Sequence, residues 1–197
     1  MKNTVHRTPQ AFTLLETLVA ITILTLATAG PLFTANRAIV AAQGARYQLI
    51  ASYLAQEGIE YVRVMRDDEY LDAYQANPAT ASSVAWTNFL TGVMPGDPRA
   101  ITQCRSPNIC TLDPTQLMGY GSLYSLNAFS SPAPLYLQAP GDAYTQQSSG
   151  ATETPFTRTV QAFDVSANEV RIVSKVSWSF HSTDYSVTIT DHLTPWQ

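Results

Sequence analysis

An apolar run near the N-terminus of this 197-residue chain, FTLLETLVAITILTLATAGPLF at residues 12–33, sets the first limit on what the chain can fold into. About 20 apolar residues in a helix cross the roughly 30 Å hydrocarbon core of a bilayer, so this run is long enough to span a membrane. Its only ionisable side chain is Glu16. A carboxylate at that depth costs about 2.5–3.5 kcal/mol on insertion scales, so a partner or a function is expected to offset the cost.

The polar segment ahead of this run, residues 1–10, carries Lys2 and Arg7 and no acidic residue. Basic residues that flank a membrane span tend to stay on the cytoplasmic side. We therefore expect a single-pass protein whose N-terminal end is cytoplasmic and whose C-terminal domain is extracytoplasmic.

A secretory signal peptide is an alternative interpretation, because it also places a basic end before an apolar stretch. Its apolar region would be residues 18–26, with a small-x-small site at residues 27–29 and cleavage before Gly30. The apolar pattern, however, already begins at Phe12, and a helical pattern continues past the proposed cut. An uncleaved membrane anchor is a further alternative.

The sequence AFTLLETLVAITIL, residues 11–24, resembles the N-terminus of type IV prepilins and pseudopilins. The resemblance implies that a dedicated peptidase cuts between Ala11 and Phe12 and methylates the new amino group of Phe12. It also implies that Glu16 pairs with the terminal amine of a neighbouring subunit during filament assembly. Such pairing is roughly offset by desolvation, so it would serve register and recruitment more than stability. The family usually has glycine where this chain has Ala11, but alanine is small enough for cleavage.

This resemblance implies a non-enzymatic structural subunit, and we interpret the chain as a minor pilin of a bacterial type IV pilus. A pseudopilin of a type II secretion or DNA-uptake system is the alternative within the family. A secreted or membrane-anchored extracytoplasmic binding module is the alternative of another class. The expected partners are other pilin subunits, prepilin peptidase, an inner-membrane assembly platform and, before assembly, the lipid bilayer. The protein would pass from the inner membrane into a cell-surface pilus or a periplasm-spanning filament.

A helical pattern continues beyond the apolar run, giving a hydrophobic part at residues 12–34 and an amphipathic part at residues 35–66. Within this helix, Gly30 and Pro31 predict a kink or local unwinding, because proline removes a backbone donor. In the second part, apolar side chains recur at spacings of three, four and seven, which is typical of an amphipathic helix. The stripe consists of Tyr47, Ile50, Leu54, Tyr61 and Met65, with Ala51 and Gly58 on or near it.

Residues 67–155 lose this periodicity, and we predict an irregular, loop-rich region with a short helix at residues 83–93. The two cysteines, Cys104 and Cys110, lie there in the turn-like sequence CRSPNIC. An extracytoplasmic location permits disulfides, so we predict a local bridge between them, with free thiols as the alternative.

An acidic cluster follows the amphipathic segment and consists of Asp67, Asp68, Glu69 and Asp72. It lacks the glycine-containing loop spacing of a calcium site. Negative charge is mildly unfavourable at a helix C-terminus, so we interpret the cluster as a solvated helix end, with the helix ending before Asp67 or turning there. The cysteines and the three histidines lack the spacing of a zinc site, and we expect neither a metal site nor a cofactor.

The C-terminal segment, residues 156–197, alternates apolar and polar side chains in the manner of half-buried strands. Three strands joined by short turns are predicted at residues 157–165, 170–180 and 185–190. They would form an antiparallel meander whose apolar face is covered by the amphipathic helix, with Leu193 and Trp196 folded back onto the domain. The predicted fold class is α+β, a long N-terminal helix packed on a C-terminal antiparallel sheet, and this resembles the architecture of pilins.

The composition and the motifs of the sequence disfavour two further classes of function. The chain has a formal net charge of -4 and only 13% charged residues, a poor match for nucleic acid, which attracts clustered lysine and arginine. The sequence contains no metal-binding histidine pair, phosphate-binding loop or nucleophile elbow. We therefore expect neither a nucleic-acid-binding protein nor an enzyme.

Overall fold

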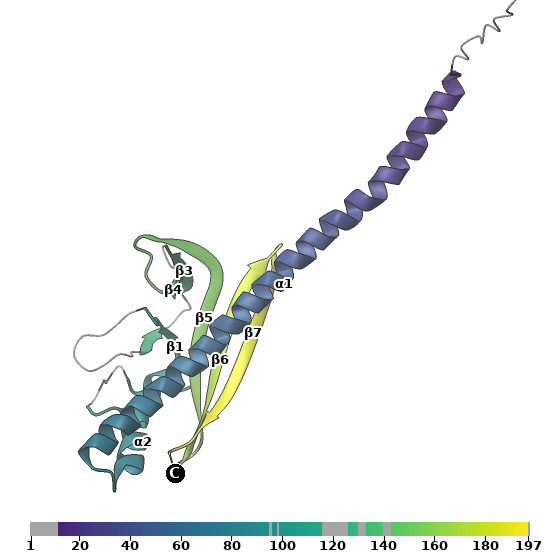
Figure 1. The fold of residues 1–197 in the computed structure, drawn as a ribbon. Helices are drawn as coiled ribbons and strands as arrows, with labels where there is room; N and C mark the ends of the chain where they lie inside the picture. Colours follow the sequence, from purple (N-terminus) through teal and green to yellow (C-terminus); the bar gives the residue numbers. More distant parts are fainter. Residues whose placement is uncertain are drawn as a thin grey trace, which may run out of the picture. The chain divides into compact units, whose positions relative to one another are not determined.

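The computed structural model describes residues 12–94, 96–97, 99–115, 126–129, 133–139 and 143–196 (Figure 1). The chain divides into two compact units, Met1–Arg46 and Tyr47–Gln197. Helix α1 (Leu14–Ala76) begins in the first unit and ends in the second. The second unit also holds all the strands and the shorter helices.

In the first unit, α1 presents its apolar side chains to the outside. Leu14, Leu24 and Phe33 are between 60% and 83% exposed. No residue of the most apolar window of this helix is buried. Residues 12–46, the described part of the first unit, therefore have no apolar core of their own.

The helix continues unbroken past Gly30 and through Pro31, so the local unwinding predicted from these two residues is not present in this structure. Thr34 helps to hold the turn, because its hydroxyl donates to the carbonyl oxygens of Gly30 (3.2 Å) and Pro31 (2.9 Å). A kink at this point in an assembled filament stays a prediction.

In the second unit, α1 packs on the sheet through the predicted apolar stripe. Leu54, Tyr61 and Met65 are at most 6% exposed. Ala51 and Gly58 are buried as well. The helix lies along the sheet and covers its apolar face, which confirms the predicted α+β fold (Figure 1).

The prediction that the helix ends before Asp67 is wrong, since α1 continues to Ala76. Arginines offset the acidic cluster: Arg66 pairs with Asp67 (2.8 Å), and Arg99 pairs with the buried Glu69 (3.1 Å). The cluster therefore lies inside the helix rather than at its end, and two of its four carboxylates have arginine partners.

The helix stops where Asn77 precedes Pro78, because a residue before proline is pushed away from the helical conformation. The Asn77 side chain accepts a hydrogen bond from the N–H of Ala79 (3.1 Å). The predicted short helix follows as α2 (Ala81–Thr91), two residues earlier than expected, and buries Trp86 and Phe89.

A seven-stranded sheet lies in the described part of the second unit. Its strands are β1 (Ile109–Leu112), β2 (Leu126–Phe129), β3 (Pro134–Gln138), β4 (Ala143–Thr145), β5 (Ala151–Ser166), β6 (Glu169–Phe180) and β7 (Thr183–Leu193). Every strand pair is antiparallel; β5 pairs with β1, β3 and β6, and β7 pairs with β6. Strands β5, β6 and β7 confirm the predicted meander.

The middle region is more regular than predicted, because it also contains β1, β2, β3 and β4. These strands have three to five residues, too few to show a period of two in the sequence. Their order comes from pairing around β5, which has 16 residues and begins at Ala151, ahead of the predicted strand.

The fully buried Arg158 joins the helix to two strands. Its guanidinium donates to the carbonyl oxygens of Leu54 on α1 (3.2 Å) and Leu112 on β1 (3.1 Å), and it pairs with Glu57. A buried charge is tolerated only when it is paired and hydrogen-bonded. The helix and the sheet are thus held in one register at this point.

Gly58 lets α1 approach β6 closely beside Arg158. A Cβ at position 58 would overlap the Ser174 hydroxyl oxygen and lie 3.3 Å from the Ser174 Cβ. The Ser174 hydroxyl is buried and has no hydrogen-bond partner in the described part of the chain. A side chain at position 58 therefore requires either Ser174 or the helix to shift.

The C-terminal residues fold back onto the domain, as predicted. Leu193 is 2% exposed in the core. The Trp196 ring lies 4.9 Å from the Arg66 guanidinium carbon, and its indole N–H donates to Asp67 (3.2 Å). The last turns of α1 are therefore covered by the end of the chain.

A Gly58→Ala substitution should lower the free energy of unfolding by about 1–3 kcal/mol, the usual cost of overpacking a core. Adding Ser174→Ala should recover most of this loss, because it removes the oxygen that the new methyl group would meet. Urea unfolding of the full chain in detergent, followed by tryptophan fluorescence, measures both effects. Gly30→Ala is the matched control, since no atom lies within 4 Å of the position of its Cβ. A double variant no more stable than Gly58→Ala alone would contradict the close approach.

Candidate functional site

Of the predicted cleavage and assembly residues, Phe12 and Glu16 lie at the start of α1. Phe12 is 77% exposed, and the helix begins two residues later at Leu14. Glu16 lies exposed in the first turn. Ala11, the residue before the predicted cut, lies outside the described residues. A new amino group at Phe12 would therefore be close in sequence to the helix end that carries Glu16.

Thr13 caps this helix, a role that our sequence interpretation missed. The backbone N–H of Glu16 donates to the hydroxyl oxygen (3.3 Å) and to the carbonyl oxygen (3.0 Å) of Thr13. A threonine followed three residues later by glutamate is the signature of a capping box, so the pattern TLLE could have located the helix start. A carboxylate in the first turn is also favoured by the helix dipole. Glu16 thus has a local role in starting the helix.

Threonines interrupt the apolar surface, but their hydroxyls are satisfied within the helix. Thr17, Thr22, Thr25 and Thr28 each donate to a carbonyl oxygen three or four residues earlier, at distances of 2.8–3.2 Å. Polar groups in a bilayer must find such internal partners, because lipid tails offer none. These side chains are therefore compatible with an apolar surrounding.

The first part of α1 is long and apolar enough to cross a membrane, with a mean hydropathy of 1.9 over its most apolar window. None of that window is buried in the structure. An apolar surface of this extent marks a site that lipid or another protein covers. The candidate functional site is therefore the whole exposed surface of residues 12–33, with Glu16 as its one ionisable side chain.

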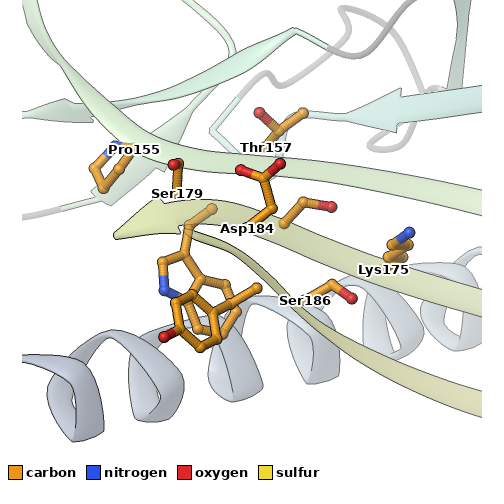
Figure 2. A pocket seen from close by; sticks show the side chains of 9 residues that line it. Pro155, Thr157, Lys175, Ser179, Asp184 and Ser186 are labelled. Atoms are coloured by element: carbon orange, nitrogen blue, oxygen red, sulfur yellow. The ribbon is translucent and has the colours of Figure 1, made fainter. Parts of the chain in front are cut away.

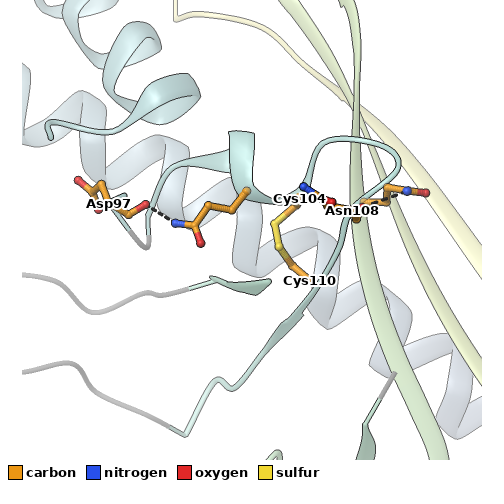
Figure 3. Close-up of a disulfide and its surroundings, with 6 residues drawn as sticks. Asp97, Cys104, Asn108 and Cys110 are labelled. Atoms are coloured by element: carbon orange, nitrogen blue, oxygen red, sulfur yellow. Dashed lines mark hydrogen bonds between the residues drawn. A yellow bond between two sulfur atoms is a disulfide. The ribbon is translucent and has the colours of Figure 1, made fainter. Parts of the chain in front are cut away.

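The sulfur atoms of Cys104 and Cys110 are joined in a disulfide (Figure 3). Both cysteines are completely buried. The loop between them is attached to β5, because the Gln161 side chain donates to the carbonyl oxygen of Asn108 (3.0 Å). The bridge therefore holds a loop against the sheet, which is a structural role.

A hollow of about 480 Å³ lies over β5, β6 and β7 (Figure 2). Polar side chains line it, among them Thr157, Lys175, Ser179, Asp184 and Ser186. Catalysis by a nucleophile or a general base needs side chains within hydrogen-bond reach of one another. Within the described residues, no side-chain hydrogen bond or ion pair joins these groups.

Asp97 and Asp191 have lowered pKa values because each accepts hydrogen bonds from an arginine, and these bonds have a structural role. Burial alone would raise the pKa of Asp97, but hydrogen bonds from the Arg99 side chain and from the backbone N–H groups of Arg99 and Val93 hold this pKa below its usual value. Burial likewise opposes the shift at Asp191, whose pKa is lowered by the hydrogen bond from Arg63 (2.9 Å).

Across the described ranges, no group of three or more His, Cys, Asp or Glu residues could hold a metal ion.

Residues 7–30 match the family model of the prokaryotic N-terminal methylation motif. This motif is the prepilin-type signature of type IV pilins and pseudopilins, so the resemblance seen in the sequence is confirmed. It implies membrane anchoring before assembly, processing by prepilin peptidase and assembly with other pilin subunits. Proteins with this motif are structural rather than enzymatic. No curated protein and no solved structure matches the chain.

Replacing Cys104 and Cys110 with serine should lower the free energy of unfolding by about 2 kcal/mol, the chain-entropy estimate for so short a loop. Urea unfolding of the full chain in detergent, followed by tryptophan fluorescence, measures the change. Reductant should destabilise the wild type by a similar amount and leave the double variant unchanged. Alkylation of both cysteines in urea without reductant would contradict the bridge.

Proposed function

We propose that this chain, which carries the prepilin-type motif, is a minor pilin of a bacterial type IV pilus. The observation that carries the proposal is the start of α1: a match to the methylation motif coincides with an apolar, uncovered helix that has one carboxylate in its first turn. A soluble binding domain needs neither a carboxylate there nor an exposed apolar helix.

Processing is the first step of the proposed mechanism. Prepilin peptidase cuts between Ala11 and Phe12 on the cytoplasmic side and methylates the amino group of Phe12. The cut removes Lys2 and Arg7 and creates a positive charge one residue before the Thr13 cap. The mature chain then carries a cation and a carboxylate at the same end of its apolar helix.

Assembly moves the apolar helix from lipid into the core of a filament. Lipid tails are as apolar as the helix, so packing and hydrogen bonding between helices drive the association, with little further hydrophobic gain. Glu16 meets the terminal amine of a neighbouring subunit, which offsets the cost of its burial and fixes the register of the two helices. The inner-membrane assembly platform supplies the surface on which this exchange occurs.

A pseudopilin of a type II secretion or DNA-uptake system is the second candidate, because pseudopilins carry the same motif. Shearing filaments from the cell surface distinguishes a minor pilin from a pseudopilin. Recovery of the protein in sheared surface filaments favours a pilus, whereas an envelope-bound protein that is required for export favours a pseudopilus.

The mass of the N-terminal peptide of the mature protein, isolated from membranes, tests the proposal directly. We expect a peptide that begins with methylated Phe12. A peptide that begins at Gly30 would show cleavage by signal peptidase and a released binding module. An intact Met1 would show a simple anchor. Either of the last two results would overturn the pilin assignment.

Glu16→Ala should reduce incorporation into filaments by about tenfold or more, because it leaves the terminal amine of the neighbouring subunit without its partner. Quantification of the subunit in sheared filaments measures this loss. Glu60→Ala, which removes an exposed carboxylate from the same helix, is the matched control and should assemble normally. The urea unfolding curve should be the same for the wild type and Glu16→Ala. Normal incorporation of Glu16→Ala would refute the assembly role.

A further inference from the structure

The charge pattern changes abruptly where the apolar run ends. Between Glu16 and Glu57 the sequence has no acidic residue, and its only charged residues are Arg37 and Arg46. Basic residues close to a span are normally depleted on the side that is translocated. Arg37 lies only four residues beyond Phe33 on that side, so its position calls for a compensating interaction.

The Arg37 side chain has a defined geometry beside an aromatic ring. Its guanidinium carbon lies 4.7 Å from the centroid of the Phe33 ring. The two residues line a hollow together with Asn36, Val40 and Ala41. Neither an ion pair nor a hydrogen bond is made by the Arg37 guanidinium to the residues that the structure describes. The aromatic contact orients the cation and leaves its N–H donors free.

The position along the helix places Arg37 at the edge of a bilayer. At about 1.5 Å per residue, residues 12–33 span about 33 Å, which matches a hydrocarbon core of roughly 30 Å. Arg37 is then about 6 Å beyond the core, within the layer of lipid headgroups, whereas Arg46 is about 20 Å beyond it. Side chains of a helix lean toward its N-terminus, so Arg37 points back toward the apolar run.

We propose that Arg37, oriented by Phe33 and assisted by the Asn36 amide, binds the phosphate of a phospholipid headgroup in the leaflet that faces away from the cytoplasm. Arginine matches a phosphate because two of its N–H groups can bind two phosphate oxygens at once. Phe33, the last residue of the apolar run, would contact the upper part of the acyl chains. This inference rests on the proposed function, since cleavage before Gly30 would remove most of the span.

The contact would set the depth of the mature subunit in the membrane. In the proposed processing, the leader that carries Lys2 and Arg7 is removed from the cytoplasmic side. On the outer side, Arg37 is the charged side chain nearest to the span. A fixed Arg37 holds Phe12 and Glu16 at the opposite boundary, where the assembly machinery acts. During assembly, the Arg37 side chain must then leave the lipid phosphate and make other contacts.

Native mass spectrometry of the full chain, released from mild detergent with equal amounts of two lipids, tests the proposal. The lipids are phosphatidylglycerol and diglucosyl-diacylglycerol, which lacks a phosphate. The wild type should retain phosphatidylglycerol preferentially, and Arg37→Gln should reduce this retention about fivefold, the effect expected for one basic residue at a lipid surface. A large excess of inorganic phosphate should not displace the lipid.

Arg46→Gln is the matched control, because it makes the same change of charge on the same helix but beyond the headgroup layer. Unchanged retention with Arg46→Gln, together with the loss with Arg37→Gln, supports the site. Equal losses in both variants, no loss with Arg37→Gln, equal retention of the two lipids, or displacement by inorganic phosphate would overturn it. The urea unfolding curves of both variants should match that of the wild type, since neither arginine belongs to the core.

These results are independent of the test of the proposed function. A mature protein that begins at methylated Phe12, combined with full lipid retention by Arg37→Gln, would overturn only the lipid site. A mature protein that begins at Gly30 would overturn the pilin assignment, whatever the purified full chain retains.

Discussion

The second unit depends on the burial of one cation between its layers. Arg158 is completely buried, and its hydrogen bonds reach α1, β1 and, through Glu57, the helix a second time. Such a cation requires all its partners at once, because an unpaired charge in a protein interior is very costly. The helix therefore cannot slide along the sheet without breaking the hydrogen bonds of the two terminal guanidinium nitrogens, and Nε already has no partner among the described residues. Gly58 adds a steric condition to this electrostatic one, since it allows the close approach that brings the carbonyl oxygen of Leu54 within reach.

The two units differ in whether their apolar side chains are buried. In the second unit, side chains such as Ile172 and Val176 are removed from water by the helix that covers them. In the first, Leu24 and Phe33 remain exposed among the residues that the structure describes. The second unit can therefore stay folded while the surroundings of the first change from lipid to protein. This division suits a subunit that is stored in one medium and used in another.

Regular, repetitive features could be predicted from the sequence, whereas features set by tertiary partners could not. The stripe through Leu54 and Met65 and the alternation in β6 repeat often enough to be recognised. The methylation motif around Phe12 and Glu16 is local and specific. In contrast, β1 and β4 are too short to show a period and are ordered by pairing around β5. The end of α1 was misplaced because the acidic cluster suggested a helix terminus, while its neutralising partner Arg99 comes 30 residues after Glu69.

The threonines of the first unit have a consequence for the exchange between media. The threonine hydroxyls donate hydrogen bonds to carbonyl oxygens of the same helix; these are Thr17, Thr22, Thr25 and Thr28. The surface can therefore leave one apolar solvent and enter another without breaking a hydrogen bond along most of its length. In the assembly proposed above, the polar cost of transfer therefore falls mainly on the charged groups at the two ends of the run, Glu16 and Arg37.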